Sequence, residues 1–348
     1  MAGSVRWGIL ATGWIAEQFV KDLNQHGHQV TAVGSRSQAS ADRFAAEFGI
    51  PKAHGSYEAL CADANVDAIY IATPHPMHAD NAKLVLSQGK HVLIEKAFTV
   101  NAREAQEIVD LGASRGLVVL EAMWTRFLPH MLRIREIVRS GVLGEIRSVV
   151  ADHTQDLPDD PKHRLNALEL GGGALLDLGI YPISFTFDVL GVPKTIAATA
   201  RLKDTGADGT VATMFTYESG AIALTLSGSD TAGRNIATIH GTEGRIEIDK
   251  VWYVPTSFRR YDATNTVVEE YVSKVEGRRT GAPGCRRQDR RDHPVAHRKR
   301  RHHGLPRHRA AADRTQIPHR VTRPTPLPDA IFPVRSRPVI CRITWRNS

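Results

Sequence analysis

The sequence predicts a two-domain α/β protein. A parallel, doubly wound sheet with helices on both faces comes first, followed by an α+β domain with an open-faced, mainly antiparallel sheet. Strand-like and helix-like segments alternate from Val5 to about Leu120, as in successive βαβ units. From Ile146 onward, short β-branched runs follow one another with glycine-containing turns between them. Because 348 residues suffice for two cores, the domains are predicted at residues 1–125 and 126–276.

The strands expected in the first domain are short apolar runs bounded by turn residues. They lie at residues 5–10, 30–33, 68–72, 92–95 and 117–120. The helices between them have apolar residues at helical spacing. Two of these helices end before Gly49 and Gly89, residues that readily take the left-handed conformation of a helix C-terminus. Asn101 is expected to cap a further helix.

The second domain is expected to begin with an amphipathic helix at 131–140, which ends near Gly141. β-branched runs then predict strands at residues 146–150, 195–201, 211–217, 221–226, 237–240 and 245–248. Turn-forming sequences such as Glu218-Ser219-Gly220 separate consecutive runs, so most of the strands are expected to pair antiparallel.

The turn between the first strand and the first helix resembles a dinucleotide-binding fingerprint. Its residues are Ala11, Thr12, Gly13, Trp14 and Ile15. With Ala16 they follow the pattern G-x-G-x-x-A, except that alanine stands at the first glycine. Gly13 would let the backbone approach a pyrophosphate, which rests on the helix N-terminus. We therefore expect residues 11–15 to bind a dinucleotide in a Rossmann domain, and a purely structural turn is the alternative.

The end of the second strand indicates which cofactor is bound. An NAD site places a carboxylate about 20 residues after the turn, where it binds the ribose 2′-hydroxyl. Ser35, Arg36 and Ser37 stand there instead, and none of them is acidic. Because Arg36 can pair with a 2′-phosphate, NADP is the expected cofactor, with NAD possible. A solvated loop arginine is the alternative.

Polar residues also follow the strand at 68–72. Thr73 and Pro74 form the bend after this strand, and they are expected to contact the cofactor. His78 is expected either to face the nicotinamide ribose or the substrate, or to serve only at the helix start. His75 is a weaker candidate for the same role.

Glu95 and Lys96 end the next apolar strand. Ligands bind at the carboxyl ends of strands in open parallel sheets, so this amine is expected in the reaction centre. Beside a positively charged nicotinamide ring, the pKa of Lys96 would fall toward useful proton transfer. Glu95 could instead hold the ammonium, and a surface ion pair is the alternative.

Two further segments contain candidate substrate and catalytic residues. Trp124, Arg126 and Phe127 suit a flat or polyhydroxylated ligand, although Trp124 and Phe127 could equally be core residues. Asp177 and Tyr181 follow a glycine run that we expect to be flexible. They are four residues apart and so share one helix face. A phenol near Lys96 could titrate low enough to act as acid or base, and a structural tyrosine is the alternative.

These motifs resemble those of the Gfo/Idh/MocA oxidoreductases over residues 4 to 275. Glu95-Lys96 matches the family's E-K-P signature, with Ala97 in place of proline, and residues 171–181 match its G-G-G…D-x-G-x-H/Y segment. The tyrosine at the last place of this segment, together with residues 121–127, is most similar to the branch of dimeric dihydrodiol dehydrogenases, which includes NADP-dependent xylose dehydrogenases. The resemblance implies Lys96 and Tyr181 as the proton-handling pair, with Asp177 nearby, and dimerisation through the second-domain sheet.

The expected activity is hydride transfer between nicotinamide and a hydroxyl carbon of a sugar, cyclic polyol or dihydrodiol. A non-catalytic NAD(P)-binding regulator of the same fold is the alternative. The N-terminus shows no secretory signal and no apolar run of about 18 residues appears, so a cytoplasmic protein without a membrane span is expected. The cysteines Cys61, Cys285 and Cys341 have no metal-binding spacing, and no metal is expected.

The charge is distributed unevenly along the chain. Residues 277–348 contain 19 Lys and Arg against 4 Asp and Glu, whereas residues 1–276 contain 26 against 33. This basic, proline-rich tail is interpreted as the product of a shifted reading frame or as a disordered end. A nucleic-acid arm is the remaining interpretation, and nucleic acid is not the expected partner.

Overall fold

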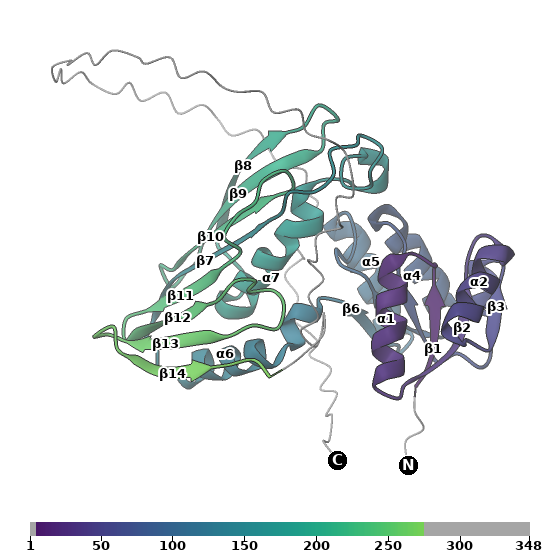
Figure 1. The fold of residues 1–348 in the computed structure, drawn as a ribbon, viewed down its shortest axis with the longest axis horizontal. Coiled ribbons are helices and arrows are strands. Elements are labelled where there is room, and N and C mark those ends of the chain that lie inside the picture. Colours follow the sequence, from purple (N-terminus) through teal and green to yellow (C-terminus); the bar gives the residue numbers. More distant parts are fainter. Residues whose placement is uncertain (1–4, 275–348) are drawn as a thin grey trace, which may run out of the picture.

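The computed structural model describes residues 5–274 and contains two sheets with their helices (Figure 1). The predictions for the tail at 277–348 lie outside the described residues. The first sheet ends at Glu121 and the second begins at Ile146, so the predicted boundary at 125/126 falls between them.

The first sheet has the strand order β3-β2-β1-β4-β5-β6, and every neighbouring pair is parallel. Its strands are β1 (Arg6–Leu10), β2 (Gln29–Gly34), β3 (Lys52–His54), β4 (Ala68–Ile71), β5 (His91–Ile94) and β6 (Val119–Glu121). From β1 the chain adds β2 and β3 on one side, and it then returns to add β4, β5 and β6 on the other side. In this topology ligands bind in the crevice at the carboxyl ends of these strands. The predicted doubly wound sheet is confirmed.

Helices cover both faces of this sheet. They are α1 (Trp14–Gln25), α2 (Gln38–Phe48), α3 (Tyr57–Cys61), α4 (His78–Ser87) and α5 (Ala102–Ser114). Successive strand residues point to opposite faces, so Ile9 packs in the cluster of α1 and α2, and Leu10 in that of α3, α4 and α5. Both side chains are fully buried. Asn101 caps α5 as expected, accepting a hydrogen bond from the Glu104 amide at 2.9 Å.

The second sheet has eight strands in the order β14-β13-β12-β11-β7-β10-β9-β8. They are β7 (Ile146–Thr154), β8 (Thr195–Leu202), β9 (Asp208–Thr216), β10 (Ile222–Gly228), β11 (Ala237–Gly241), β12 (Gly244–Ile248), β13 (Phe258–Asp262) and β14 (Val267–Tyr271). Only the central pair β7–β10 is parallel, so the sheet is mainly antiparallel as predicted.

Two helices, α6 (Pro129–Ser140) and α7 (Ile180–Leu190), cover one face of this sheet, on the side of the first domain (Figure 1). Their apolar faces and the inner face of the sheet form one core around Trp252 and Phe215, both fully buried. A π-helical turn, Leu175–Gly179, leads directly into α7. This joint brings the amino-terminal end of α7 to the carboxyl end of β5.

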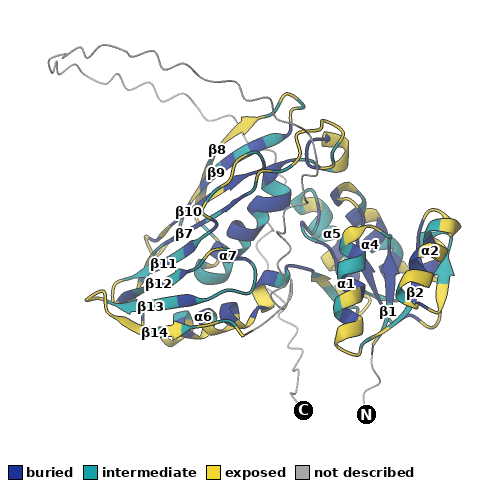
Figure 2. Cartoon of the chain, viewed as in Figure 1, coloured by how far each residue is buried: buried dark blue, intermediate teal, exposed yellow. Residues whose placement is uncertain are grey.

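The opposite face of the sheet has no covering element among residues 5–274. Alternate residues of its central strands place large apolar side chains there, each 40–46% exposed: Val150, Met214, Ile222, Leu224 and Leu226. Figure 2 shows this alternation of buried and accessible residues along the strands. An apolar face of this kind is typical of an interaction surface.

Among the strands and α-helices of residues 5–274, the sequence analysis did not predict β3, α3, β13 and β14. β3 and α3 have three and five residues, too few to show a period. β13 and β14 are rich in charged residues, and Arg259 pairs with Glu270 across the two strands. Neither strand alternates apolar and polar residues, so neither shows the period of a half-buried strand.

One helical segment, Leu168–Leu190, is long and apolar enough to cross a membrane by composition, although none was expected. Most of it (61%) is buried inside the protein, and α7 packs against β7 and β10. Its apolar character is thus accounted for by the core of the second domain.

Candidate active site

The turn after β1 leaves open space above the N-terminus of α1. Gly13 caps the helix without a side chain, and a Cβ added there would meet no described atom within 4 Å. The glycine is therefore not needed for packing within the protein, but it would be needed for the close approach of a ligand. Ala11 has φ of 87°, a conformation that favours the glycine it replaces.

The other turn residues and the end of β2 border the same space. Trp14 is 56% exposed, whereas Ala16 is fully buried against the sheet as the close-packing position requires. Ser35 is buried at the end of β2, and Arg36 beside it is exposed. Arg36 is close enough to Tyr57 to lower the pKa of that phenol, although burial outweighs it and the pKa is raised overall.

Lys96 and Asp177 form an ion pair between the two domains. The Lys96 Nζ donates to Asp177 Oδ1 at 2.7 Å and to the Asp177 carbonyl at 2.8 Å. Burial alone would lower the pKa of the amine, but Asp177 and Tyr181 outweigh it and raise the pKa. Burial would likewise raise the pKa of Asp177, but Lys96 and Arg164 hold it well below its usual range. Without a nicotinamide ring beside it, Lys96 is therefore a charged ammonium, and the lowered pKa predicted beside a bound ring stays a prediction.

Tyr181 lies on the same side of the helix as Asp177, as the spacing predicted. The Lys96 Nζ is 5.3 Å from the centre of its ring, and its hydroxyl accepts a hydrogen bond from Trp124 Nε1 at 3.0 Å. Burial raises the pKa of the phenol, and the opposing effect of Lys96 does not overcome it. The expectation of a low-titrating phenol is therefore wrong for the protein without ligands, where Tyr181 is protonated.

Glu95 acts on the Lys96 ammonium through its charge, which contributes to the raised pKa of the amine. Its carboxylate accepts hydrogen bonds from the Tyr70 hydroxyl and from the Lys96 backbone amide, the latter at 3.1 Å. Because Tyr70 comes from β4 and Glu95 follows β5, this pair joins the ends of neighbouring strands. Glu95 thus fixes the backbone that bears Lys96.

The two histidines after β4 lie under the Lys96 loop. His78 is fully buried, and its ring nitrogens are 2.9 Å from the Ala97 carbonyl and 2.8 Å from the Thr73 carbonyl. The first residue of α4 is His78, so the structure favours the helix-start alternative, and a direct contact with cofactor or substrate is not supported. His75 is 3.2 Å from the Lys96 carbonyl, and burial lowers its pKa to about 4.

Thr73 and Pro74 form the bend above α4. Thr73 is buried, and its hydroxyl accepts a hydrogen bond from Asn81 Nδ2 at 3.1 Å. Pro74 is exposed at the end of β4. This bend lies next to the β1 turn because β1 and β4 are adjacent strands.

The predicted substrate residues after β6 make different contacts. Trp124 reaches Tyr181, whereas Arg126 pairs with Asp188 of α7 at 3.0 Å. Phe127 is 68% exposed, so the core-packing alternative is wrong for it. Of the three predicted substrate residues, the structure places only Trp124 in contact with the Lys96–Asp177–Tyr181 group.

The sequence analysis did not predict several residues of this site. Arg164 donates to Asp177 Oδ1 at 3.1 Å from the loop after β7, a segment without a motif. His153 of β7 packs edge-on to Tyr181 at 4.9 Å and stacks on Tyr253 at 3.7 Å. Burial, with a contribution from Lys96, lowers the pKa of His153 to about 3, so it is neutral. The period-2 burial of β7 would have indicated that His153 faces inward.

The glycine run before Asp177 is required by close packing rather than by flexibility. Gly173 has φ of 136°, and a Cβ there would clash with Asp208 Oδ1. Asp208 in turn accepts a hydrogen bond from the Leu175 amide at 2.6 Å and so fixes the start of the helical segment. Burial raises the pKa of Asp208 to about 6.

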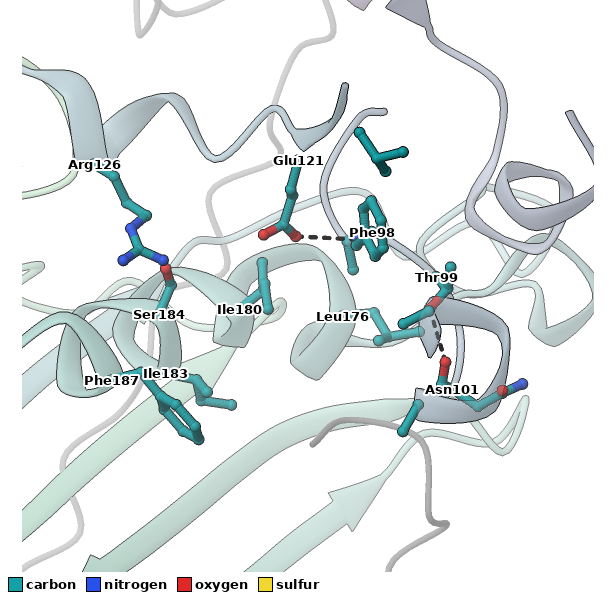
Figure 3. Close-up of a pocket in the computed structure, with 14 residues that line it drawn as sticks. Phe98, Thr99, Asn101, Glu121, Arg126, Leu176, Ile180, Ile183, Ser184 and Phe187 are labelled. Carbon is teal, nitrogen blue, oxygen red and sulfur yellow. Dashed lines mark hydrogen bonds between the residues drawn. The ribbon is translucent and has the colours of Figure 1, made fainter. Parts of the chain in front are cut away.

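A separate cavity of about 280 Å³ lies behind the Lys96 loop (Figure 3). Ala97 and Phe98 line it, but Lys96 does not. Figure 3 shows Glu121, which accepts a hydrogen bond from the Phe98 amide at 3.1 Å, with Arg126 farther along the same cavity. Burial raises the pKa of Glu121.

The family is decided by comparison with known proteins. Residues 5–123 match the oxidoreductase family with an NAD-binding Rossmann fold, and residues 131–247 match the GFO/IDH/MocA C-terminal domain. The chain belongs to the Gfo/Idh/MocA oxidoreductases. In this oxidoreductase the matched ranges contain Lys96, Asp177 and Tyr181.

Similar proteins carry related names. Trans-1,2-dihydrobenzene-1,2-diol dehydrogenase of Mus musculus is 40% identical, over 72% of this chain and 76% of its own. D-xylose 1-dehydrogenase (NADP(+)) of Hypocrea jecorina is 35% identical, over 74% and 75%. A 3-ketoreductase from Actinomadura kijaniata, solved with NADP and TDP-benzene, is 29% identical with a TM-score of 0.70, over 78% and 85%.

Proposed function

We propose that this oxidoreductase uses NADP to transfer hydride to and from a hydroxyl-bearing carbon of a sugar, cyclic polyol or dihydrodiol. The observation that carries the proposal is the group formed by Lys96, Asp177 and Tyr181 at the carboxyl end of β5, beside the switch point of the parallel sheet. The named relatives act on a dihydrodiol and on D-xylose, which supports this substrate class.

The residues around the β1 turn fit a dinucleotide. The open space at Gly13 suits a pyrophosphate, and exposed Arg36 suits a 2′-phosphate. When bound there, NADP supplies the nicotinamide ring that accepts or gives the hydride. Glu95 and His78 hold the backbone around Lys96 and so position the amine beside the ring.

The same geometry indicates that Tyr181 is the group that donates and accepts the proton. Tyr181 is protonated before substrate binds, so in carbonyl reduction its hydroxyl is ready to donate the proton to the carbonyl oxygen. In alcohol oxidation the phenol must first lose its proton, and the nearby Lys96 ammonium favours the phenolate. Asp177 keeps Lys96 charged and fixed in place.

A substrate panel tests this proposal. Purified protein is mixed with NADP⁺ and D-xylose, inositol, a trans-dihydrodiol or a cyclic alcohol, and reduced cofactor is followed by absorbance. We expect turnover with at least one of these classes. NADPH binding without hydride transfer to or from any of them would favour the non-catalytic regulator instead.

Arg36 is expected to determine the choice of cofactor. Arg36→Glu replaces a 2′-phosphate partner by a carboxylate suited to the ribose hydroxyl, so the Kd for NADPH should rise about 10- to 100-fold. The Kd for NADH should fall. Titration of both cofactors by protein fluorescence measures this, with Arg139→Glu on α6 as the control for charge reversal. A wild type that binds NADH more tightly than NADPH would contradict the assignment.

Gly13 is expected to be needed for the cofactor but not for the fold. Its φ of −82° and ψ of 169° are accessible to alanine, and the added methyl group meets no described atom within 4 Å. Gly13→Ala should therefore leave the unfolding temperature unchanged while raising the Kd for NADPH at least about 10-fold. Unchanged NADPH affinity would place the pyrophosphate elsewhere.

The open face of the second sheet is proposed as a homodimer interface. Its central strands expose a continuous apolar group that includes Ile222, Leu224 and Leu226. Leu224→Lys should convert a dimer to a monomer in light scattering, whereas Val192→Lys, at an exposed apolar residue between α7 and β8, should not. A wild type that is monomeric at all concentrations would contradict this interface.

A further inference from the structure

The helical segment at residues 175–190 carries both Asp177 and Tyr181, and we call it the catalytic helix. Its first amides have no partner within the helix, as at every helix N-terminus. Asp208, the first residue of β9, supplies a partner, because its Oδ2 accepts a hydrogen bond from the Leu175 amide at 2.6 Å. These amides carry partial positive charge, so a carboxylate binds them more strongly than a neutral group does. A residue of the sheet thus holds the start of the helix that bears the site.

The glycine before the catalytic helix allows this carboxylate to come so close. A Cβ added to Gly173 would clash with Asp208 Oδ1 and lie 3.0 Å from Asp208 Cγ. The Gly173 amide donates to the Leu165 carbonyl at 3.0 Å, which fixes the chain on its other side. The chain therefore passes directly over the Asp208 carboxylate at the point where the helix begins.

The turn between β8 and β9 fixes Asp208 itself. Within this turn the Lys203 amide donates to the Ala207 carbonyl at 2.8 Å, and the Gly206 amide donates to the Lys203 carbonyl at 2.9 Å. The Lys203 ammonium also donates to Asn166 Oδ1 at 2.8 Å, in the loop that precedes the catalytic helix. The sheet therefore sets the position of Asp208 relative to the helix start.

The ionised form of Asp208 holds the helix start at a cost to the stability of the whole fold. Burial raises its pKa to about 6, although hydrogen bonds from the Leu175, Asp208 and Ala174 amides and the charge of Lys203 oppose this effect. Because the folded-state pKa lies above the ordinary value of 3.8, the ionised form lowers stability above about pH 6, and this cost is absent below about pH 3.8. Folding alone therefore does not account for the charge. The other charged side chains on the surrounding elements are either exposed or ion-paired: Asp204 and Glu169, and Asp177, Arg201 and Asp230.

We propose that Asp208 is a positioning residue, which holds the start of the catalytic helix so that Asp177 and Tyr181 keep their places. This rests on the proposed function, in which Lys96 and the catalytic helix act on the reacting oxygen. Asp177 follows Leu175 by two residues and accepts from Lys96 Nζ with both its carbonyl and its carboxylate, at 2.8 and 2.7 Å. A displaced helix start would disturb both of these hydrogen bonds at once. Asp208 thus acts through the helix, because its carboxylate binds the Leu175 amide.

The test is the pH profile of Asp208→Asn, a variant of nearly the same shape that keeps one acceptor oxygen and loses the charge. In wild type kcat should fall about 10-fold as the pH is lowered through about 6, because protonation removes the charge from the hydrogen bond. Oxidation and reduction should fall together, whereas a group that exchanges the substrate proton would affect them in opposite directions. Asp208→Asn should show the lower kcat on both sides of this pH. Its Kd for NADPH should be unchanged, and above this pH its unfolding temperature should be no lower than that of wild type.

Asp204→Asn is the control, because it removes an exposed carboxylate from the same turn. Hydrogen exchange of the amides at 174–181, followed by mass spectrometry, gives a readout that does not need turnover. These amides should exchange about 10-fold faster in Asp208→Asn than in wild type or in Asp204→Asn. If Asp208→Asn does not fold, Asp208→Ser is compared in its place.

Three results would overturn the inference. They are equal exchange in wild type and Asp208→Asn, a variant with the kcat of wild type, and a variant that loses kcat together with unfolding temperature while keeping the fall of kcat at low pH. The last result would assign Asp208 a structural role only. If wild type turns over no compound of the substrate panel, the proposed function fails, and the exchange rates alone decide whether Asp208 holds the helix.

Discussion

Lys96→Met should lower kcat by about 10²- to 10⁴-fold, because it removes the cation that stabilises the reacting oxygen. The same cation lowers the pKa of Tyr181 and so favours its phenolate. The substitution also leaves the buried Asp177 carboxylate with Arg164 as its remaining cation. Loss of one member of a buried ion pair is costly, so the variant should unfold at a lower temperature as well. Steady-state kinetics and a thermal melt measure the two effects.

Lys96→Arg separates catalysis from folding. It retains the positive charge beside Asp177, but the larger, planar guanidinium cannot place that charge where the Lys96 amine lies beside the Tyr181 ring, so the variant should fold and still lose most of its activity. Lys83→Met is the control on the surface, where Lys83 pairs with Glu107 between α4 and α5. This exposed pair should have little effect on stability or kcat. Activity within about 3-fold of wild type in both Lys96 variants would exclude Lys96 from the reaction.

Tyr181→Phe should lower kcat by about 10²-fold or more and change the pH dependence of the reaction. In wild type the pKa of the phenol is raised, so the rate of alcohol oxidation should increase with pH as more phenolate forms. The rate of carbonyl reduction should fall over the same range, because that direction uses the protonated phenol. Both slopes should disappear in Tyr181→Phe.

Tyr217→Phe is the matched control. Tyr217 is also a buried tyrosine of the second-domain core, with its pKa raised by burial, but it lies at the end of β9 rather than beside Lys96. Its removal should leave both pH profiles unchanged. A Tyr181→Phe enzyme that keeps the wild-type slopes would assign the proton to another group.

The part of the site that could be predicted depends on local sequence and on one topological rule. The small residues of the β1 turn and the apolar strand before Lys96 are contiguous motifs, and parallel strands bring their carboxyl ends to one edge. The spacing of Asp177 and Tyr181 likewise needs only the helical period. The resemblance to the Gfo/Idh/MocA oxidoreductases then places Lys96 with Asp177 and Tyr181, and the structure brings the three together.

The rest depends on three-dimensional contacts that no motif contains. Arg164 comes from a loop whose path is set by the buried Asn166, and His153 is a single inward-facing residue in a strand. The pKa direction of Tyr181 was predicted wrongly because burial and the charge of Lys96 oppose each other. Which one prevails depends on distance and depth, which the sequence does not contain.

A crystal structure of the protein with NADP⁺ tests the central claim most directly. We expect the pyrophosphate over Gly13, the 2′-phosphate at Arg36, and the nicotinamide ring beside Lys96, with the Tyr181 hydroxyl on the substrate side. A nicotinamide ring bound away from the Lys96–Asp177 pair, or a Lys96 amine turned toward solvent, would contradict the account.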